Sequence, residues 1–143
     1  MRRVLKAALI VLVEDNPADV LLVRKALREV LKEEGVAVNL TCFEDGQKAL
    51  NSLSKPGRKA PDLILLDLHL PKTEGVDVLR AVRNMPKLAD VPVVILTSSN
   101  SPADMHRTAL LGAARFISKP SGLNDFLREV GRGVEEMLQA SGW

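Results

Sequence analysis

Five short and nearly continuous apolar runs are the feature that most restricts how this chain can fold. Each run is too short for a core helix, and it lacks the strict alternation of a strand with one face in water. Such runs are typical of parallel strands that are buried on both faces. We expect strands at residues 8–13, 38–43, 63–66, 93–96 and 114–117.

Segments with helical periodicity lie between and after these runs. Asn16-Pro17 is a favourable N-cap and first-turn pair, and it predicts a helix that Gly35 closes. Ser101-Pro102 repeats the same signal before a fourth helix. The other helices are expected at about 47–54, at about 75–84, and from 123 almost to the end of the chain. Five strands alternating with five helices indicate a doubly wound parallel α/β sheet.

Length and composition narrow the function classes further. A chain of 143 residues can bury one substantial core but cannot hold two full domains. We therefore expect one domain over residues 1–143, with its core at about 7–140 and no effector domain. The net charge of +2 is too small for the concentrated basic field that nucleic-acid binding needs. The single cysteine, Cys42, excludes an internal disulfide.

The N-terminal segment resembles a signal peptide only briefly. Its apolar run ends at Glu14-Asp15 without a small-residue cleavage site, and no stretch approaches the roughly 18 apolar residues of a membrane span. The expectation is a soluble cytoplasmic protein that binds neither membranes nor nucleic acid.

Polar residues follow four of the expected strands. Glu14 and Asp15 come after the first strand, Asp67 after the third, Thr97 ends the fourth and Lys119 follows the fifth. In an open parallel sheet, sites form beyond the carboxyl ends of the strands, so we expect these residues to converge on one crevice. Taken alone, the two acids after the first strand would be interpreted as a helix cap. The joint pattern after four strands favours a functional site.

The residue types indicate metal and phosphoryl chemistry. Three carboxylates in one pocket repel one another, and a shared Mg²⁺ offsets that cost because this hard cation favours oxygen ligands. Lys119 can pair with Asp67 and neutralise an incoming phosphoryl group, and Thr97 supplies a hydroxyl donor. The carboxylate of Asp67 is a competent nucleophile toward activated phosphorus, and the product would be a mixed anhydride.

The ordered set Glu14-Asp15, Asp67, Thr97-Ser98 and Lys119-Pro120 resembles the receiver domain of bacterial response regulators over nearly the whole chain. The resemblance implies a flavodoxin-like sheet with strand order 2-1-3-4-5. It also implies a two-component phosphorelay protein that accepts a phosphoryl group from a sensor histidine kinase. Such a protein signals by binding a downstream partner, and it is no enzyme beyond its own phosphotransfer and slow autodephosphorylation.

The same resemblance assigns residues. Asp67 would be the phosphoacceptor, with Mg²⁺ bound directly by Asp15 and Asp67, through water by Glu14, and by the backbone carbonyl of His69. Thr97 and Lys119 would contact the phosphoryl group. Phe116, three residues before Lys119, holds the position of an aromatic switch that turns inward on activation. It lacks the hydroxyl of a tyrosine, and His69 stands where asparagine is frequent. The His69 side chain is therefore expected to influence dephosphorylation.

Two segments point to a particular group within this family. Residues 65–72 with Gly75, and residues 97–100, are similar to stand-alone regulators that partner phytochrome-type histidine kinases. The downstream partner stays unknown. A homodimer is a further expectation, because the apolar terminal helix carries Phe126, Met137 and Trp143.

Two other functions stay open on the sequence. A Mg²⁺-dependent phosphatase of the haloacid-dehalogenase type also uses an aspartate at a strand end. That family places its nucleophile early in an Asp-x-Asp pattern, whereas Asp67-Leu68-His69 lacks the second acid. The other alternative is a pseudo-receiver that keeps the fold without the chemistry, against which the intact acids and lysine argue.

Overall fold

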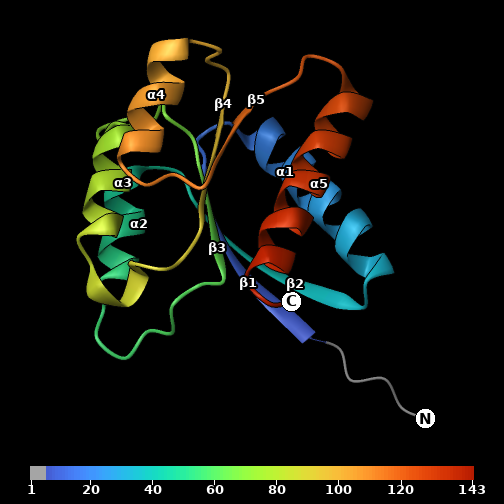
Figure 1. The fold of residues 1–143 in the computed structure, drawn as a ribbon, viewed down its shortest axis with the longest axis horizontal. Helices are drawn as coiled ribbons and strands as arrows, with labels where there is room; N and C mark the ends of the chain where they lie inside the picture. The colour runs from blue at the N-terminus through green and yellow to red at the C-terminus, as the bar shows by residue number, and fades with distance from the viewer. Residues whose placement is uncertain (1–5) are drawn as a thin grey trace.

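A computed structural model describes residues 6–143 as one parallel sheet between two layers of helices (Figure 1). The elements in chain order are β1 (Lys6–Val13), α1 (Pro17–Glu33), β2 (Val36–Phe43), α2 (Gly46–Leu53), β3 (Leu63–Leu66), α3 (Gly75–Arg83), the short 3₁₀ helix η1 (Pro86–Leu88), β4 (Val93–Thr97), α4 (Pro102–Leu110), β5 (Arg115–Ser118) and α5 (Leu123–Ala140). The strand order is β2-β1-β3-β4-β5, with every neighbouring pair parallel. The predicted fold class and strand order are therefore confirmed.

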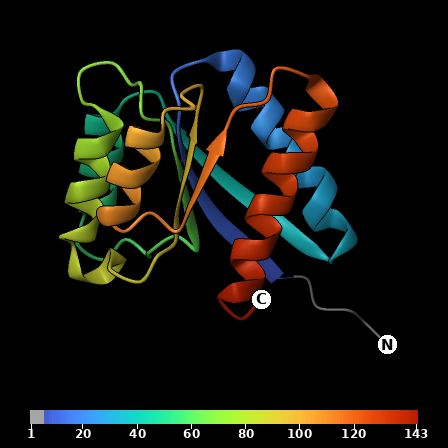
Figure 2. The same cartoon turned by 45° about the horizontal axis from the view of Figure 1, so that its top comes forward.

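The helices divide unequally between the two faces of the sheet. Helices α1 and α5 cover one face, and α2, α3 and α4 cover the other (Figures 1 and 2). The arrow of β5 in Figure 2 points to the top, where α1 and α5 begin, so the carboxyl ends of the strands lie at that edge.

The element boundaries differ from the predicted ones by one or two residues. Strands β1 and β2 both begin two residues earlier than expected, because Lys6 pairs with Val36 and Ala7 with Ala37 at the start of the ladder. These first pairs are partly exposed, so hydrophobic patterning does not indicate them. The turn η1 was not predicted, because three residues around a proline carry no periodicity.

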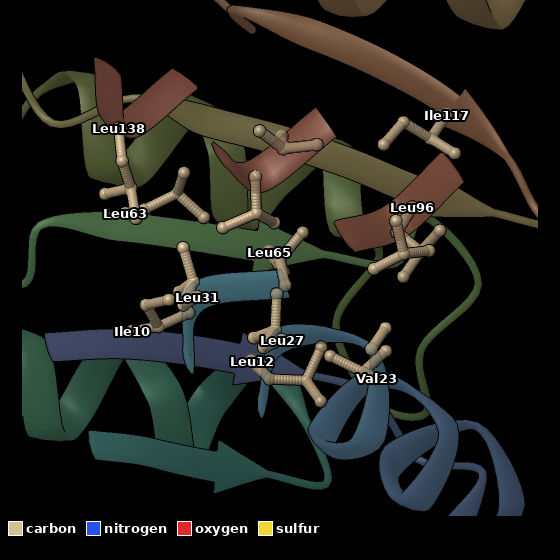
Figure 3. Packing of buried hydrophobic residues seen from close by; sticks show 14 of the residues in the cluster. Ile10, Leu12, Val23, Leu27, Leu31, Leu63, Leu65, Leu96, Ile117 and Leu138 are labelled. Atoms are coloured by element: carbon tan, nitrogen blue, oxygen red, sulfur yellow. The ribbon is translucent and has the colours of Figure 1, made fainter. Parts of the chain in front are cut away.

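The core consists of two apolar clusters, one on each face of the sheet. Strand β3 is central, and all four of its residues are fully buried. Leu63 and Leu65 point toward α1 and α5, where they meet residues such as Leu27, Leu31 and Leu138 (Figure 3). Ile64 and Leu66 point to the opposite face and join the cluster under α2 and α3. The continuous apolar run of β3 is therefore explained by burial on both faces.

The residues predicted to begin helices α1 and α4, and to end α1, do so in the structure. The side chain of Asn16 accepts hydrogen bonds from the backbone N–H groups of Ala18 at 2.9 Å and Asp19 at 3.3 Å, which caps α1. Gly35 ends this helix region with φ of 73°, a left-handed conformation that glycine adopts without strain. The Ser101 hydroxyl caps α4 by accepting from the N–H of Asp104 at 3.4 Å.

The end of α5 packs against its own domain. Phe126 is buried, and Met137 and Trp143 pack beside the cluster under α1 and α5. The ammonium of Lys6 lies 5.4 Å from the centre of the Trp143 ring, within the range of a cation–π interaction. The homodimer stays a prediction, and these three side chains no longer argue for it because they serve the internal core. Within residues 6–143, no helix combines the length and apolar character needed to cross a membrane.

Candidate functional site

The predicted polar residues do converge at the carboxyl edge of the sheet. The N–H of Asp67 donates to the carbonyl of Val13 at 3.1 Å, which places the start of the β3–α3 loop beside the end of β1. The N–H of Lys119 donates to the carbonyl of Thr97 at 2.7 Å, which does the same for β5 and β4. Strand register therefore brings together residues that are up to 105 positions apart.

Three carboxylates form the centre of this site. One oxygen from each of Glu14, Asp15 and Asp67 lies within 4.8 Å of the others. Glu14 and Asp67 are buried, with 3% and 5% of their surface exposed, whereas Asp15 faces solvent. The cluster is therefore open to solvent on the Asp15 side and enclosed behind it.

The carboxyl of Glu14 is electrostatically unfavourable when charged. Burial raises the pKa of Glu14 to about 7, and the charge of Asp67 adds to this against the hydrogen bond from Lys119. The N–H of Asn16 also donates to a Glu14 oxygen at 3.2 Å. Acidic oxygens that are held close together despite this cost fit a divalent cation, which would remove the repulsion. The donor set, all oxygen, suits Mg²⁺.

Lys119 is the cation of the site. Its Nζ lies 2.5 Å from a Glu14 oxygen, 2.8 Å from Asp19 Oδ2 and 3.3 Å from Asp67 Oδ2. Burial alone would lower the pKa of this amine, but hydrogen bonds to Asp19 and Glu14 and the charge of Asp67 raise it well above its usual range. The predicted pairing of Lys119 with Asp67 is therefore present in the structure, as the longest of three contacts.

Asp19 is a member of this site that sequence reasoning missed. It lies in the first turn of α1, where an acidic residue is ordinarily explained by the helix dipole. A weak signal was available, since the residue three positions later is Leu22 and cannot serve as a cationic partner.

The backbone around Asp67 is held by a close approach of α3. A Cβ on Gly75 would lie 2.2 Å from the carbonyl oxygen of Asp67 and 2.6 Å from Cα of Leu68, so only glycine fits there. The N–H of Gly75 donates to the carbonyl of Leu68 at 3.0 Å. Gly75 therefore helps to present the Asp67 side chain at the site.

His69 contacts Asp67 through its backbone. Its N–H donates to Asp67 Oδ1 at 3.2 Å, and its side chain is exposed. The ligand function predicted for its carbonyl stays a prediction. His106, on α4, is exposed.

Thr97 connects the site to the β4–α4 loop. Its side chain is fully buried, and its Oγ1 accepts from the N–H of Ser99 at 3.5 Å. The Ser99 hydroxyl donates to Asp104 Oδ2 at 2.6 Å, and the Ser118 hydroxyl donates to the carbonyl of Ser99 at 2.6 Å. Thr97 is thus linked through Ser99 both to the start of α4 and to β5, by one long hydrogen bond of its own and by two short ones that Ser99 makes.

Phe116 lies on β5, where it pairs with Ile95 of β4, two residues before Thr97. It is half-buried and packs against the core cluster under α2 and α3. The ring is therefore neither fully buried nor free, and its predicted function as a switch stays a prediction.

Comparison with known proteins agrees with this arrangement. Residues 10–131 match the family described as the response regulator receiver domain. Response regulator Rcp1 of Synechocystis is 37% identical over 130 residues, which cover 88% of this chain and 85% of Rcp1.

Two solved structures show the same fold. The phosphorylated cyanobacterial phytochrome response regulator RcpA is 33% identical to this chain. The two structures superpose with a TM-score of 0.83, and the match covers 96% of this chain and 97% of RcpA. The Mn²⁺-bound form of Rcp1 from Synechocystis is 36% identical, with a TM-score of 0.78 over 90% of this chain and 92% of the other.

Proposed function

Because this chain belongs to the response regulator receiver family of two-component signalling, we propose that Asp67 is the residue that accepts the phosphoryl group. The observation that supports this most directly is the position of Asp67 at the end of the central strand. Its Oδ2 faces Lys119 at 3.3 Å and its Oδ1 accepts from the His69 N–H at 3.2 Å. Glu14 is also buried and also contacts Lys119 and a backbone N–H, that of Asn16, but it follows β1, whereas Asp67 follows the central strand β3.

The chemical step is a displacement at phosphorus. An oxygen of Asp67 forms the new P–O bond while the P–N bond of a phosphohistidine, or the P–O bond of acetyl phosphate, breaks. The leaving group takes the electron pair of the broken bond, as neutral imidazole once a proton is supplied, or as acetate. The product on Asp67 is an acyl phosphate, a mixed anhydride that water can later hydrolyse.

Mg²⁺ would be held directly by Asp15 and Asp67, through water by Glu14, and by the carbonyl of His69. When bound, the ion supplies positive charge to the phosphoryl oxygens during transfer. Lys119 provides a second positive charge, and the Thr97 hydroxyl donates a hydrogen bond to a phosphoryl oxygen. Of these groups, Lys119 already contacts Asp67 Oδ2, at 3.3 Å.

The signal is proposed to leave through the face of α4, β5 and α5. A dianionic group on Asp67 attracts the Thr97 hydroxyl and Lys119, and the movement of Thr97 vacates space for the Phe116 ring. Thr97 is linked to α4 through Ser99 and Asp104, so a shift at the site is transmitted to the start of that helix.

The partners follow from the family and from the relatives. We propose a sensor histidine kinase as donor, of the phytochrome type because RcpA is a phytochrome response regulator. The exchange would take place in the cytoplasm. A separate downstream protein would recognise the phosphorylated form, and slow autodephosphorylation would end the signal.

The direct test is phosphorylation of the purified protein by acetyl phosphate with Mg²⁺, followed by intact-mass and peptide analysis. Wild-type protein should gain one phosphoryl group on the peptide that contains Asp67, and Asp67→Asn should gain none. Asp77→Asn is the matched control, because Asp77 is an exposed aspartate on α3 that pairs with Arg80. If Asp67→Asn is phosphorylated to the wild-type extent, the assignment is wrong.

A second experiment tests the proposed Mg²⁺ ligands with Asp15→Asn. Because Asp15 is exposed and faces the other two acids, its loss should weaken Mg²⁺ binding and slow phosphorylation while the fold is retained. Removal of one repelling charge is expected to leave stability equal or higher. Unchanged Mg²⁺ affinity in a titration would contradict this assignment.

A further inference from the structure

The closest contacts of Lys119 are with carboxylates other than Asp67, the proposed phosphoacceptor. Its closest oxygens belong to Glu14 at 2.5 Å and Asp19 at 2.8 Å, and the Asp67 oxygen is farther, at 3.3 Å. The side chains of Lys119 and Asp19 are only 11% and 21% exposed, so solvent screens their attraction less than that of a surface pair. Asp19 is therefore a substantial partner of the lysine.

Asp19 differs from the other aspartates at the same helical position. Helices α1, α3, α4 and α5 each carry an aspartate as their third residue: Asp19, Asp77, Asp104 and Asp125. The last three each pair with an arginine three residues later on their own helix. Asp19 has Leu22 at that place, and its partner Lys119 is 100 positions away. A general helix-capping preference explains the aspartate, but it does not explain this partner.

We propose that Asp19 is a positioning residue that holds the Lys119 ammonium in the unphosphorylated protein and competes for it with the phosphoryl group. This inference rests on the proposed phosphorylation of Asp67. By this competition, Asp19 opposes phosphorylation and weakens the phosphorylated state.

The donor count of Lys119 supports the competition. An ammonium has three N–H donors, and the three contacts with Glu14, Asp19 and Asp67 use all of them. Phosphorylation replaces the Asp67 oxygen, the farthest of the three acceptors, by phosphoryl oxygens that carry more negative charge, so Lys119 has to move toward them and away from one of its two closer partners. Glu14 is buried and is also held by the N–H of Asn16, whereas Asp19 is the more exposed carboxylate and can turn to solvent. Asp19 is therefore the partner that Lys119 gives up.

Charge acts in the same direction. Asp19 adds a fourth carboxylate to the region of Glu14, Asp15 and Asp67, and it repels an incoming dianion. The Asn16 side chain accepts from the N–H of Asp19, which fixes the first turn of α1 and keeps this carboxylate on the Lys119 side. Neutralising Asp19 should both free Lys119 and reduce the repulsion.

The test compares Asp19→Asn with wild type and with Asp77→Asn. Asp77 has the same helical position but pairs with Arg80, so it controls for the helix dipole. Beryllofluoride affinity is measured by NMR titration at saturating Mg²⁺ for each protein, and the rate of phosphorylation by acetyl phosphate is measured in parallel. Asp19→Asn should bind beryllofluoride about three- to tenfold more tightly and be phosphorylated faster, which corresponds to a partly buried ion pair. Asp77→Asn should match wild type.

A conservative variant separates charge from structure. Asp19→Glu keeps the carboxylate and should return both values to within about twofold of wild type, since the longer side chain can still reach Lys119. Equal or weaker beryllofluoride binding by Asp19→Asn would overturn the proposal. If wild type itself takes up no phosphoryl group at Asp67, the proposed function fails instead, and the two failures are distinguishable.

A measurement on the wild-type protein covers the case in which a variant does not fold. The ¹³C resonance of the Asp19 side-chain carboxylate should shift when beryllofluoride and Mg²⁺ are added together, beyond its shift with Mg²⁺ alone, because Lys119 leaves it. The Asp77 carboxylate should not shift. An Asp19 resonance that is unchanged by beryllofluoride would overturn the proposal.

Discussion

Helix α1 and helix α4 begin with the same signals but bury very different amounts of apolar surface. Each opens with a polar cap and a proline, and each carries an aspartate in its first turn. In α1 four residues are buried: Val23, Ala26, Leu27 and Leu31. In α4 only Thr108 is buried, while Met105 and Leu110 are 46% and 73% exposed.

The difference indicates which side of the site can move. Helix α1 is fixed to the sheet and to α5 by its apolar face, so the site groups near its start, Glu14 and Asp19, have a rigid support. Helix α4 has few buried apolar contacts and is connected to the site through the Ser99–Asp104 hydrogen bond. Elements with few buried contacts open or shift at low cost in free energy. Phosphorylation is therefore expected to displace α4 rather than α1.

The largest expected effect tests how firmly the two helices are held. Leu27→Ala removes a fully buried side chain of α1, and it should lower the free energy of unfolding by about 2 to 5 kcal/mol. Leu110→Ala removes an exposed side chain of α4 and should change it by no more than about 0.5 kcal/mol. Urea unfolding monitored by circular dichroism measures both.

If Leu27→Ala and Leu110→Ala lose similar stability, α4 is packed more firmly than its burial indicates. The proposed difference in packing between α1 and α4 is then wrong. Leu21→Ala provides the matched control within α1, because Leu21 is 67% exposed and should behave like Leu110.

A smaller effect concerns the buried carboxyl of Glu14, in the loop between β1 and α1. The pKa of Glu14 is about 7 in the folded protein against an ordinary value of 4.5, so the folded state holds this proton more tightly than the unfolded state. Without Mg²⁺, stability should therefore fall as pH rises through this interval. Glu14→Gln removes this dependence, and its stability relative to wild type should rise by about 1 to 3 kcal/mol between pH 4 and pH 8.

Urea unfolding in the presence of a chelator at a series of pH values checks the Glu14 prediction. Glu29→Gln, an exposed substitution on α1, is the control and should give the wild-type profile. Parallel profiles for Glu14→Gln and wild type would show that Glu14 carries no such cost.

The smallest expected effect is the change in α4 when a phosphoryl analogue binds at Asp67. With beryllofluoride and Mg²⁺, wild-type chemical shifts should change around Asp67 and across residues 103–126, and they should change less along α1 beyond its first turn. Thr97→Ala should suppress the changes in α4 while Asp67 still accepts phosphate, because the hydroxyl that joins Ser99 to the site is gone.

Thr97→Ser keeps the hydroxyl and is expected to preserve the response of α4. If wild-type shifts stay confined to the pocket, α4 is not the output element. The function of Phe116 as a switch should then be abandoned.

Much of this protein could be predicted from the sequence, because its main signals are local. The run at 63–66 identified β3, since a strand buried on both faces cannot tolerate polar residues. Asn16-Pro17 and Ser101-Pro102 identified two helix starts, since capping depends on neighbouring residues. The strand ends then identified the positions of Asp67, Thr97 and Lys119, because parallel strands bring their carboxyl ends to one edge.

The sequence by itself determined the alternation of strands and helices, the edge at which the site forms, and the acids, hydroxyl and lysine available there. Only the tertiary structure decided that Asp19 shares Lys119 with Glu14 and Asp67, and that α4 is left with little apolar burial. Both depend on how α1 and α4 are placed against the sheet. Contacts between segments 100 residues apart depend on strand order and helix placement, which neither periodicity nor capping encodes.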